Sequence, residues 1–249
     1  MMKFFLKKII SLFLLLVPLR MILLVFKKII YIKLEKTDPK YALKKLLELD
    51  NFIYLLTGVY SLSYGKGIHV KKRLTKYVDY FTSQAKKIGG PCLDIGCGDG
   101  ELAMNIAKQQ IKITGIELSL EQIKKAKEKN SYKNLNFIHG DILNYKSKDL
   151  KFKTIILSNV LEHIKNRVLF LKKIKKQFSA KYFLIRVPVF DRDWRVPLKK
   201  ELEIDYRLDS THFIEYTDQI LLDELRQSKI KVLDFKRIWG EIWLVGKAL

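Results

Sequence analysis

The 249-residue sequence contains few cysteines and histidines, two and four respectively. Cys92 and Cys97 are five residues apart, on one expected strand and the turn that follows it, so they cannot easily form a disulfide there. The chain also lacks a Cys-x-x-Cys pair and any Cys/His spacing typical of a zinc site. These absences argue against a disulfide-stabilised secreted fold and indicate a reducing, cytoplasmic setting.

Acidic residues are scarce relative to basic ones. The chain has 26 Asp and Glu against 48 Lys and Arg, for a formal net charge of +22. Residues 1–90 alone hold 18 basic and 5 acidic residues, so more than half of the excess lies in the first third. This bias favours an anionic partner, such as a membrane surface, a nucleic acid or a phosphorylated substrate. A generally solvated basic surface is the alternative.

Residues 1–36 form the most apolar part of the chain. Within them, residues 9–26 are almost wholly apolar but number only 18, barely the length of a membrane span. Pro18 would kink a helix there, and Arg20 would be costly at the centre of a bilayer. No small-residue site for signal-peptide cleavage follows. We therefore expect a helical membrane-associating segment at the cytoplasmic face, as a single span or as a re-entrant or interfacial anchor. A pair of buried core helices is the alternative.

Residues 37–89 are expected to form a helical lead-in. Asp38-Pro39 marks a break, and the apolar spacing predicts one helix over 41–56 and a second from about residue 71 to 81. The second helix is rich in basic and aromatic residues and immediately precedes the first expected strand. It could be a lid that contacts substrate, with His69, Arg73 and Tyr77 as candidates, or simply a solvated helix.

From residue 90 onward, apolar strands alternate with helices, which predicts a parallel sheet with right-handed crossovers. The last two expected strands are separated by only about six residues, too few for a crossover, so they should form an antiparallel hairpin. The expected strands are 92–95, 111–118, 135–138, 154–158, 182–188, 230–235 and 242–245.

The stretch 91–100 reads Pro-Cys-Leu-Asp-Ile-Gly-Cys-Gly-Asp-Gly and joins a strand to a helix. A dinucleotide fingerprint would need a glycine at position 101, where this chain has Glu101. Asp94 before the turn would repel a pyrophosphate but could hold an ammonium group, directly or through water. The spacing therefore favours a small, cationic nucleoside that carries an amino acid.

Residues 93–100 resemble motif I of the class I S-adenosylmethionine-dependent methyltransferases, and further motifs follow in register over about residues 74–249. The resemblance implies that Glu117 binds the ribose hydroxyls, that Asp141 faces the adenine amino group and that Ile142 packs on the ring. The segment 158–164 would line the cofactor and open on the substrate. Residues 212–217 are similar to the family's connection into its last helix.

The resemblance also implies the fold and the cofactor. The expected fold is a Rossmann-like three-layer α/β sandwich over 90–249, with a seven-stranded mostly parallel sheet of order 3-2-1-4-5-7-6 whose last strand is antiparallel. The expected cofactor is S-adenosylmethionine. Its expected binding residues are Asp94, Gly96, Cys97, Gly98, Gly100, Glu117, Leu118, Asp141, Ile142 and Asn159.

For catalysis, His163 is the best-placed base candidate, although a histidine that merely orders the loop is an equal alternative. His212 is a weaker candidate, for substrate contact. Asp191, Asp193 and His212 share a long loop, but no tight ligand spacing supports a metal site, and we expect none.

Three functions remain open. The first is a membrane-associated methyltransferase of a small-molecule, glycan or lipid-linked acceptor, modified on oxygen. The glycan alternative draws on the stretch 67–77, which resembles the lead-in of bacterial methyltransferases found with surface-polysaccharide genes. The second is an RNA methyltransferase attracted by the positive charge, although the chain lacks the Asn/Asp-Pro-Pro-Tyr type of signature. The third is a non-catalytic adaptor, against which the intact glycine and acid set argues. The oligomeric state is not predicted.

Overall fold

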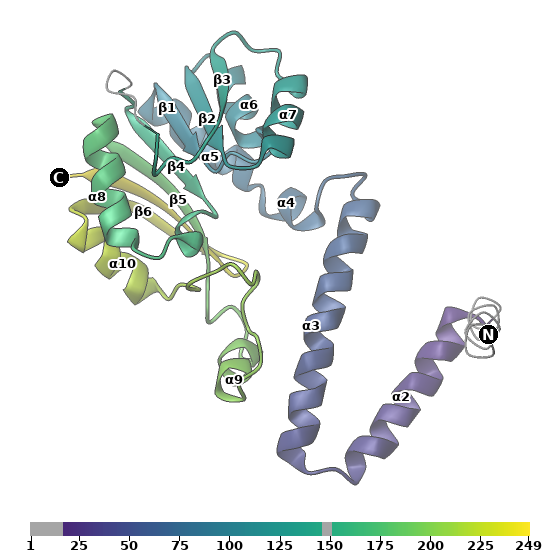
Figure 1. The fold of residues 1–249 in the computed structure, drawn as a ribbon. Coiled ribbons are helices and arrows are strands. Elements are labelled where there is room, and N and C mark those ends of the chain that lie inside the picture. The colour runs from purple at the N-terminus through teal and green to yellow at the C-terminus, as the bar shows by residue number, and fades with distance from the viewer. Residues whose placement is uncertain (1–16, 146–150) are drawn as a thin grey trace. The chain divides into compact units, whose positions relative to one another are not determined.

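The computed structural model describes residues 17–145 and 151–249, which divide at residue 55 into two compact units (Figure 1). The helices are α2 (Leu19–Glu35), α3 (Pro39–Tyr64), α4 (Val70–Thr75), α5 (Tyr77–Ile88), α6 (Glu101–Lys108), α7 (Leu120–Lys129), the 3-10 turn η1 (Leu161–His163), α8 (Arg167–Phe178), α9 (Arg195–Glu201) and α10 (Asp218–Gln227). The strands are β1 (Cys92–Ile95), β2 (Ile113–Glu117), β3 (Leu135–His139), β4 (Thr154–Ser158), β5 (Tyr182–Pro188), β6 (Ile230–Ile238) and β7 (Glu241–Ala248).

The N-terminal unit comprises α2 and the first part of α3. Pro18 is extended, with ψ at 134°, and α2 begins directly after it, so no helix continues through position 18. The disruption that Pro18 was expected to cause is thus a helix start, while residues 9–16 of the expected anchor lie outside the described part of the chain. Among the described residues, no helix combines the length and the apolar character needed to cross a membrane. The structure thus gives no support to a membrane span over residues 17–36.

The lead-in to the sheet contains two helices where the apolar spacing predicted one over 71–81. Lys76 takes a left-handed conformation, with φ at 55°, and ends α4 before α5 begins. Because Phe81 and Ala85 of α5 are buried in the core that includes β1 and α6, α5 is part of the sheet's own packing.

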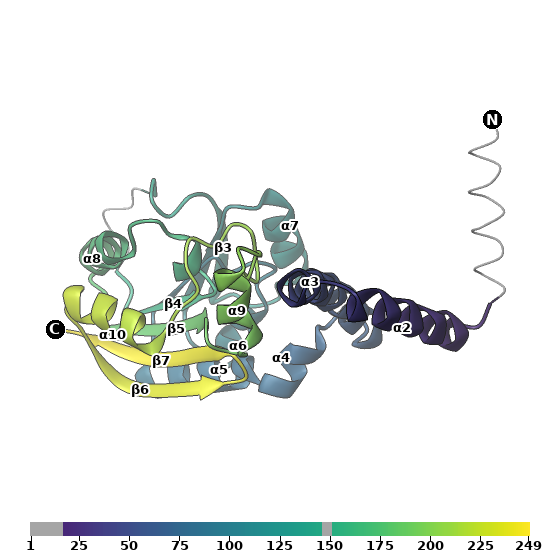
Figure 2. The same cartoon turned by 90° about the horizontal axis from the view of Figure 1, so that it is seen from below.

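The sheet has the predicted order, β3-β2-β1-β4-β5-β7-β6. The first five strands pair in parallel, and β7 is antiparallel to both β5 and β6. Strands β6 and β7 lie side by side at one edge in both views (Figures 1 and 2). The predicted hairpin is therefore confirmed.

Side chains alternate between two cores, as the period-two geometry of strands requires. In β4, Ile155 and Leu157 face the core formed with α8 and α10, while Ile156 faces the core formed with α5, α6 and α7. Side chains of β1 and β5 alternate between the two cores in the same way. Helices thus cover both faces of the sheet, and the predicted three-layer sandwich is confirmed (Figure 1).

The long connection from β5 to α10 contains α9, which the sequence did not predict. It runs over the carboxyl end of the sheet, where Phe213 N–H donates to the Glu162 carbonyl at 2.8 Å. This contact brings residues 209–213 against η1.

Candidate active site

The carboxyl ends of the parallel strands border two neighbouring cavities. The smaller, of about 220 Å³, is lined by the turn after β1 together with residues of α4, α5, β4 and β5. The larger, of about 490 Å³, is lined by the ends of β2 and β3 and by η1. Gly96 and Asn159 line both cavities. An elongated ligand could therefore lie across the end of β1, where open α/β sheets bind their ligands.

The turn after β1 lines the smaller cavity with backbone atoms at Gly96 and Gly98. Gly98 has φ at 54°, and a Cβ added there would meet nothing within 4 Å, so the space beside its Cα is open. Gly100 has φ at 80°, but its Cβ would lie 2.4 Å from Phe137 Cζ. Gly100 lines neither cavity, and its lack of a side chain allows α6 to begin close against β3.

Asp94 lies at the floor of the smaller cavity. Its side chain is buried, and burial, with a smaller contribution from Glu117, raises the pKa of its carboxyl group to about 7. Asp94 forms no ion pair with any residue that the structure describes, and a buried carboxylate favours a cationic ligand, since a cation would compensate its lost hydration. Cys97 lines the same cavity, but burial raises the pKa of its thiol, so the sulfur is a poor nucleophile.

Glu117 stands at the end of β2 and borders the larger cavity with Leu118. Its carboxylate accepts hydrogen bonds from Gly98 N–H at 3.1 Å and from Ser119 N–H at 2.9 Å. These bonds tie the glycine turn to the start of α7 and fix the carboxylate at the border between the two cavities. Further lone pairs of both oxygens remain available for hydroxyl donors.

Asp141 and Ile142 follow β3 and also line the larger cavity. Asp141 accepts hydrogen bonds from Leu143 N–H at 2.8 Å and from the Asn144 side chain at 2.7 Å, which orders the turn after the strand. Ile142 is buried and belongs to the core. This wall thus presents an acid beside an apolar surface, a combination suited to the edge and the face of a planar base.

A cationic cluster in the smaller cavity was not predicted from the sequence. Arg186 projects from β5 on the same face as Asp94, and it stacks on the Tyr77 ring with 3.8 Å from its guanidinium carbon to the ring centroid. Lys72 of α4 also lines the cavity and pairs with Glu101. The one signal in the sequence was a single arginine inside the apolar strand β5.

The predicted substrate contacts are only partly brought together. Tyr77 lines the smaller cavity. The His69 ring accepts a hydrogen bond from Lys71 N–H at 3.1 Å and caps α4, while Arg73 is exposed and lines neither cavity. His212 lies instead beside the larger cavity, next to His163.

His163 lines the larger cavity and is held in one tautomer. Thr211 has a single hydroxyl proton, which it donates to Asp209 at 2.7 Å. The 2.9 Å contact between Thr211 Oγ1 and His163 Nδ1 must then use a proton on Nδ1. In the neutral ring, the lone pair therefore lies on Nε2, which can accept a proton or bind a cation.

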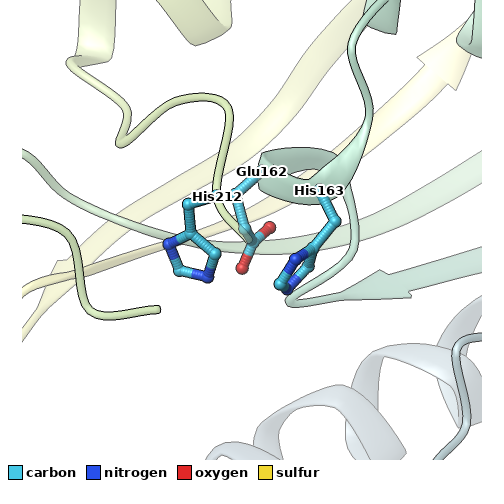
Figure 3. A group of neighbouring side chains, drawn as sticks. All are labelled: Glu162, His163 and His212. Atoms are coloured by element: carbon cyan, nitrogen blue, oxygen red, sulfur yellow. The ribbon is translucent and has the colours of Figure 1, made fainter. Parts of the chain in front are cut away.

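Three side chains meet beside this cavity: Glu162, His163 and His212 (Figure 3). The two imidazole rings are in edge-to-face contact, with centroids 4.6 Å apart, and the Glu162 carboxylate lies beside them (Figure 3). The acids that the sequence grouped with His212 pair elsewhere, Asp191 with Arg237 and Asp193 with Arg195. The grouping with Glu162 was missed because nothing local relates residue 162 to residue 212.

Comparisons with known proteins agree with this geometry. A family model described as a methyltransferase domain matches residues 86–225. Among curated proteins, a probable (S)-tetrahydroprotoberberine N-methyltransferase of Papaver bracteatum is 38% identical over 93 residues, which cover 35% of this chain and 26% of that protein. An uncharacterized RNA methyltransferase of Mycoplasma mobile is 27% identical over 141 residues, which cover 51% of this chain and 39% of that protein. The chain thus spans well under half the length of these relatives.

Solved structures share the fold at low identity. The magnesium protoporphyrin IX methyltransferase of Synechocystis PCC 6803, crystallised with S-adenosylhomocysteine, superposes with a TM-score of 0.57 at 13% identity. The superposition covers 70% of this chain and 83% of that one.

Proposed function

Because the chain belongs to the methyltransferase-domain family, the class I enzymes whose cofactor is S-adenosylmethionine, we propose that it transfers the cofactor's methyl group to a small-molecule, glycan or lipid-linked acceptor. One observation carries the proposal: the two cavities meet at Gly96 and Asn159, with Asp94 on one side and Glu117 and Asp141 on the other. In this assignment the methionine part lies in the smaller cavity and the adenosine part in the larger one.

The charges of the site fit the parts of the cofactor. The ammonium group would compensate the buried Asp94, and the ribose hydroxyls would donate to Glu117, which the backbone already orients. Arg186 and Lys72 give the smaller cavity positive charge for the cofactor's carboxylate. The adenine ring would lie between the side chains of Ile142 and Leu118, with its amino group toward Asp141.

Methyl transfer from a sulfonium is an in-line displacement, so the protein contributes mainly by holding the acceptor atom against the methyl group. A hydroxyl acceptor must also lose its proton, and His163 is placed to take it on Nε2. The bond from sulfur to methyl breaks as the bond from oxygen to methyl forms, which leaves neutral S-adenosylhomocysteine.

Two observations support this class of acceptor: the names of the relatives and the exposed surface of α2. The first curated relatives are named as methyltransferases of small molecules. In the N-terminal unit, α2 exposes large apolar side chains such as Leu24, Phe26 and Ile29 next to Lys27 and Lys28. We propose that this helix lies on an anionic membrane surface at the cytoplasmic face, with its apolar side chains in the lipid and its lysines at the headgroups.

The acceptor can be tested with methyl-labelled S-adenosylmethionine and the full chain, offered lipid, glycan and RNA fractions in parallel. The proposal predicts incorporation into the lipid or glycan fraction, or into a small molecule extracted with them. Co-sedimentation with vesicles tests the location: binding to phosphatidylserine vesicles but not to pure phosphatidylcholine vesicles is expected, with Lys27→Glu/Lys28→Glu as the weakened variant. Equal recovery with and without vesicles would contradict the membrane proposal.

RNA is the second candidate acceptor, favoured by the net charge of +22 and by the RNA methyltransferase among the relatives. Incorporation into RNA alone, with binding that weakens steeply as salt rises, would select this function over the first.

A further inference from the structure

We propose that Glu162, His163 and His212 form a binding site for one divalent metal ion at the border of the larger cavity. One possible ligand atom from each of the three residues lies within 4.8 Å of the others, so small side-chain rotations would bring all three onto one ion (Figure 3). Two imidazoles and one carboxylate are donors suited to Zn²⁺, Mn²⁺ or Fe²⁺.

The second observation is the state of Glu162 itself. The side chain is fully buried, yet neither carboxylate oxygen has a hydrogen-bond partner among the described residues. Buried carboxylates are almost always paired, and this one lies beside two imidazole rings that could share a cation with it (Figure 3).

The two histidines are oriented as metal ligands are. Nδ1 of His163 donates to Thr211, which is in turn bonded to Asp209. Nδ1 of His212 faces Glu215 Oε1 at 3.4 Å, and the carboxylate can only accept from it. Both rings therefore keep their lone pairs on Nε2, and each is held through its other nitrogen, as metal-bound histidines are in proteins.

Neutral imidazole is the form that binds metal. The lone pair on Nε2 of each neutral ring is the donor that an ion would use, because Nδ1 of each ring is engaged with Thr211 or Glu215. Three protein ligands leave coordination positions open, and His163 places them beside the cavity that Asn159 and Val160 also line. If the proposed methyl transfer holds, an acceptor oxygen could occupy an open position. Nε2 of His163 would then bind the ion and could not act as the base.

Calorimetric titration of Zn²⁺ and Mn²⁺ into the metal-stripped full chain tests the site. We expect one equivalent to bind in the wild type and no saturable binding in Glu162→Gln or His212→Asn. The Thr211→Val variant, which keeps all three ligands but loses the support of His163, should bind roughly 10–100-fold more weakly. His139→Gln is the matched control outside the cluster and should bind as the wild type does.

Thermal unfolding provides a readout that is independent of activity. Without metal, Glu162→Gln should be at least as stable as the wild type, because it replaces an unpaired buried carboxylate by a neutral amide. Added metal should raise the melting temperature of the wild type and leave that of Glu162→Gln unchanged. Absence of binding by the folded wild type, or equal binding by Glu162→Gln, would overturn the proposal. Binding of S-adenosylhomocysteine to the same metal-stripped protein shows whether the cofactor site stands on its own.

Discussion

Arg186 and Glu241 form a two-pronged ion pair across β5 and β7, with Nε and Nη2 of the arginine donating to the two carboxylate oxygens at 2.7 and 2.8 Å. Both side chains are largely buried, and Glu241 also pairs with Lys71 at 2.6 Å. The pairing holds the pKa of the Glu241 carboxyl group at about 2 in spite of its burial. Through this pair, the antiparallel strand β7 fixes a cationic side chain that lines the smaller cavity.

Removing one partner of this pair should lower the free energy of unfolding more than removing both partners does. Glu241→Leu leaves the Arg186 guanidinium buried without its counterion, and we expect a loss of about 3–5 kcal/mol in the free energy of unfolding. Urea denaturation of Glu241→Leu, Arg186→Met and the double variant measures the coupling. If the two single losses simply add in the double variant, the pair is not a coupled unit.

Two glycines of one turn should behave differently when changed to alanine. Both variants strain the backbone, but only Gly100→Ala drives a Cβ into the Phe137 ring. Gly100→Ala should therefore lower the free energy of unfolding by about 1–3 kcal/mol more than Gly98→Ala does. Denaturation curves of both variants test this difference. Phe137→Leu should recover part of the loss in the Gly100→Ala background and none in the Gly98→Ala background.

Cofactor affinity should depend on pH through Asp94. Its pKa of about 7 in the empty protein means that the carboxyl group is mostly protonated below that value. Binding of an ammonium group favours the carboxylate, so affinity for S-adenosylmethionine should rise from pH 6 to pH 8 with release of a proton. Calorimetry in buffers of different ionisation enthalpy detects that proton, and Asp94→Asn should show weaker binding without this pH dependence.

The stability of the empty protein should change with pH in the opposite direction. A folded-state pKa above the ordinary value of 3.8 means that the native state holds its proton more tightly, so the contribution of Asp94 to stability is full below pH 3.8 and is lost as pH rises to about 7. Bound cofactor should therefore raise the melting temperature more at pH 8 than at pH 6. An equal rise at both values would contradict the placement of the ammonium group at Asp94.

Glu117 should contribute to cofactor affinity through charged hydrogen bonds. Glu117→Ala removes the acceptor for the ribose hydroxyls and for Gly98 N–H, and hydrogen bonds to a charged group contribute about 1.5–3 kcal/mol. Affinity for S-adenosylhomocysteine should accordingly fall by roughly 10–100-fold. Glu121→Ala is the matched control, because Glu121 is exposed and pairs only with Lys125 among the contacts described. Equal effects of the two variants would assign Glu117 a structural role alone.

Local patterns predicted most of the sheet. The bounds of β1, β4 and β5 match the expected ranges because buried parallel strands are short apolar runs with clear ends. The left-handed Lys76 was not predictable, since no glycine or proline marks the break between α4 and α5. The grouping of Glu162 with His212 depends on the path of the loop after β5, which no residue pattern encodes.

Calorimetric titration of S-adenosylhomocysteine into the full chain tests the central claim most directly. The account predicts binding at one site per chain, weakened in Asp141→Ala and unchanged in Asp223→Ala, a partly exposed α10 position paired with Arg226. Circular dichroism verifies that each variant is folded. Absence of binding by the folded wild-type protein, or equal affinity in both variants, would contradict the assignment of the two cavities to S-adenosylmethionine.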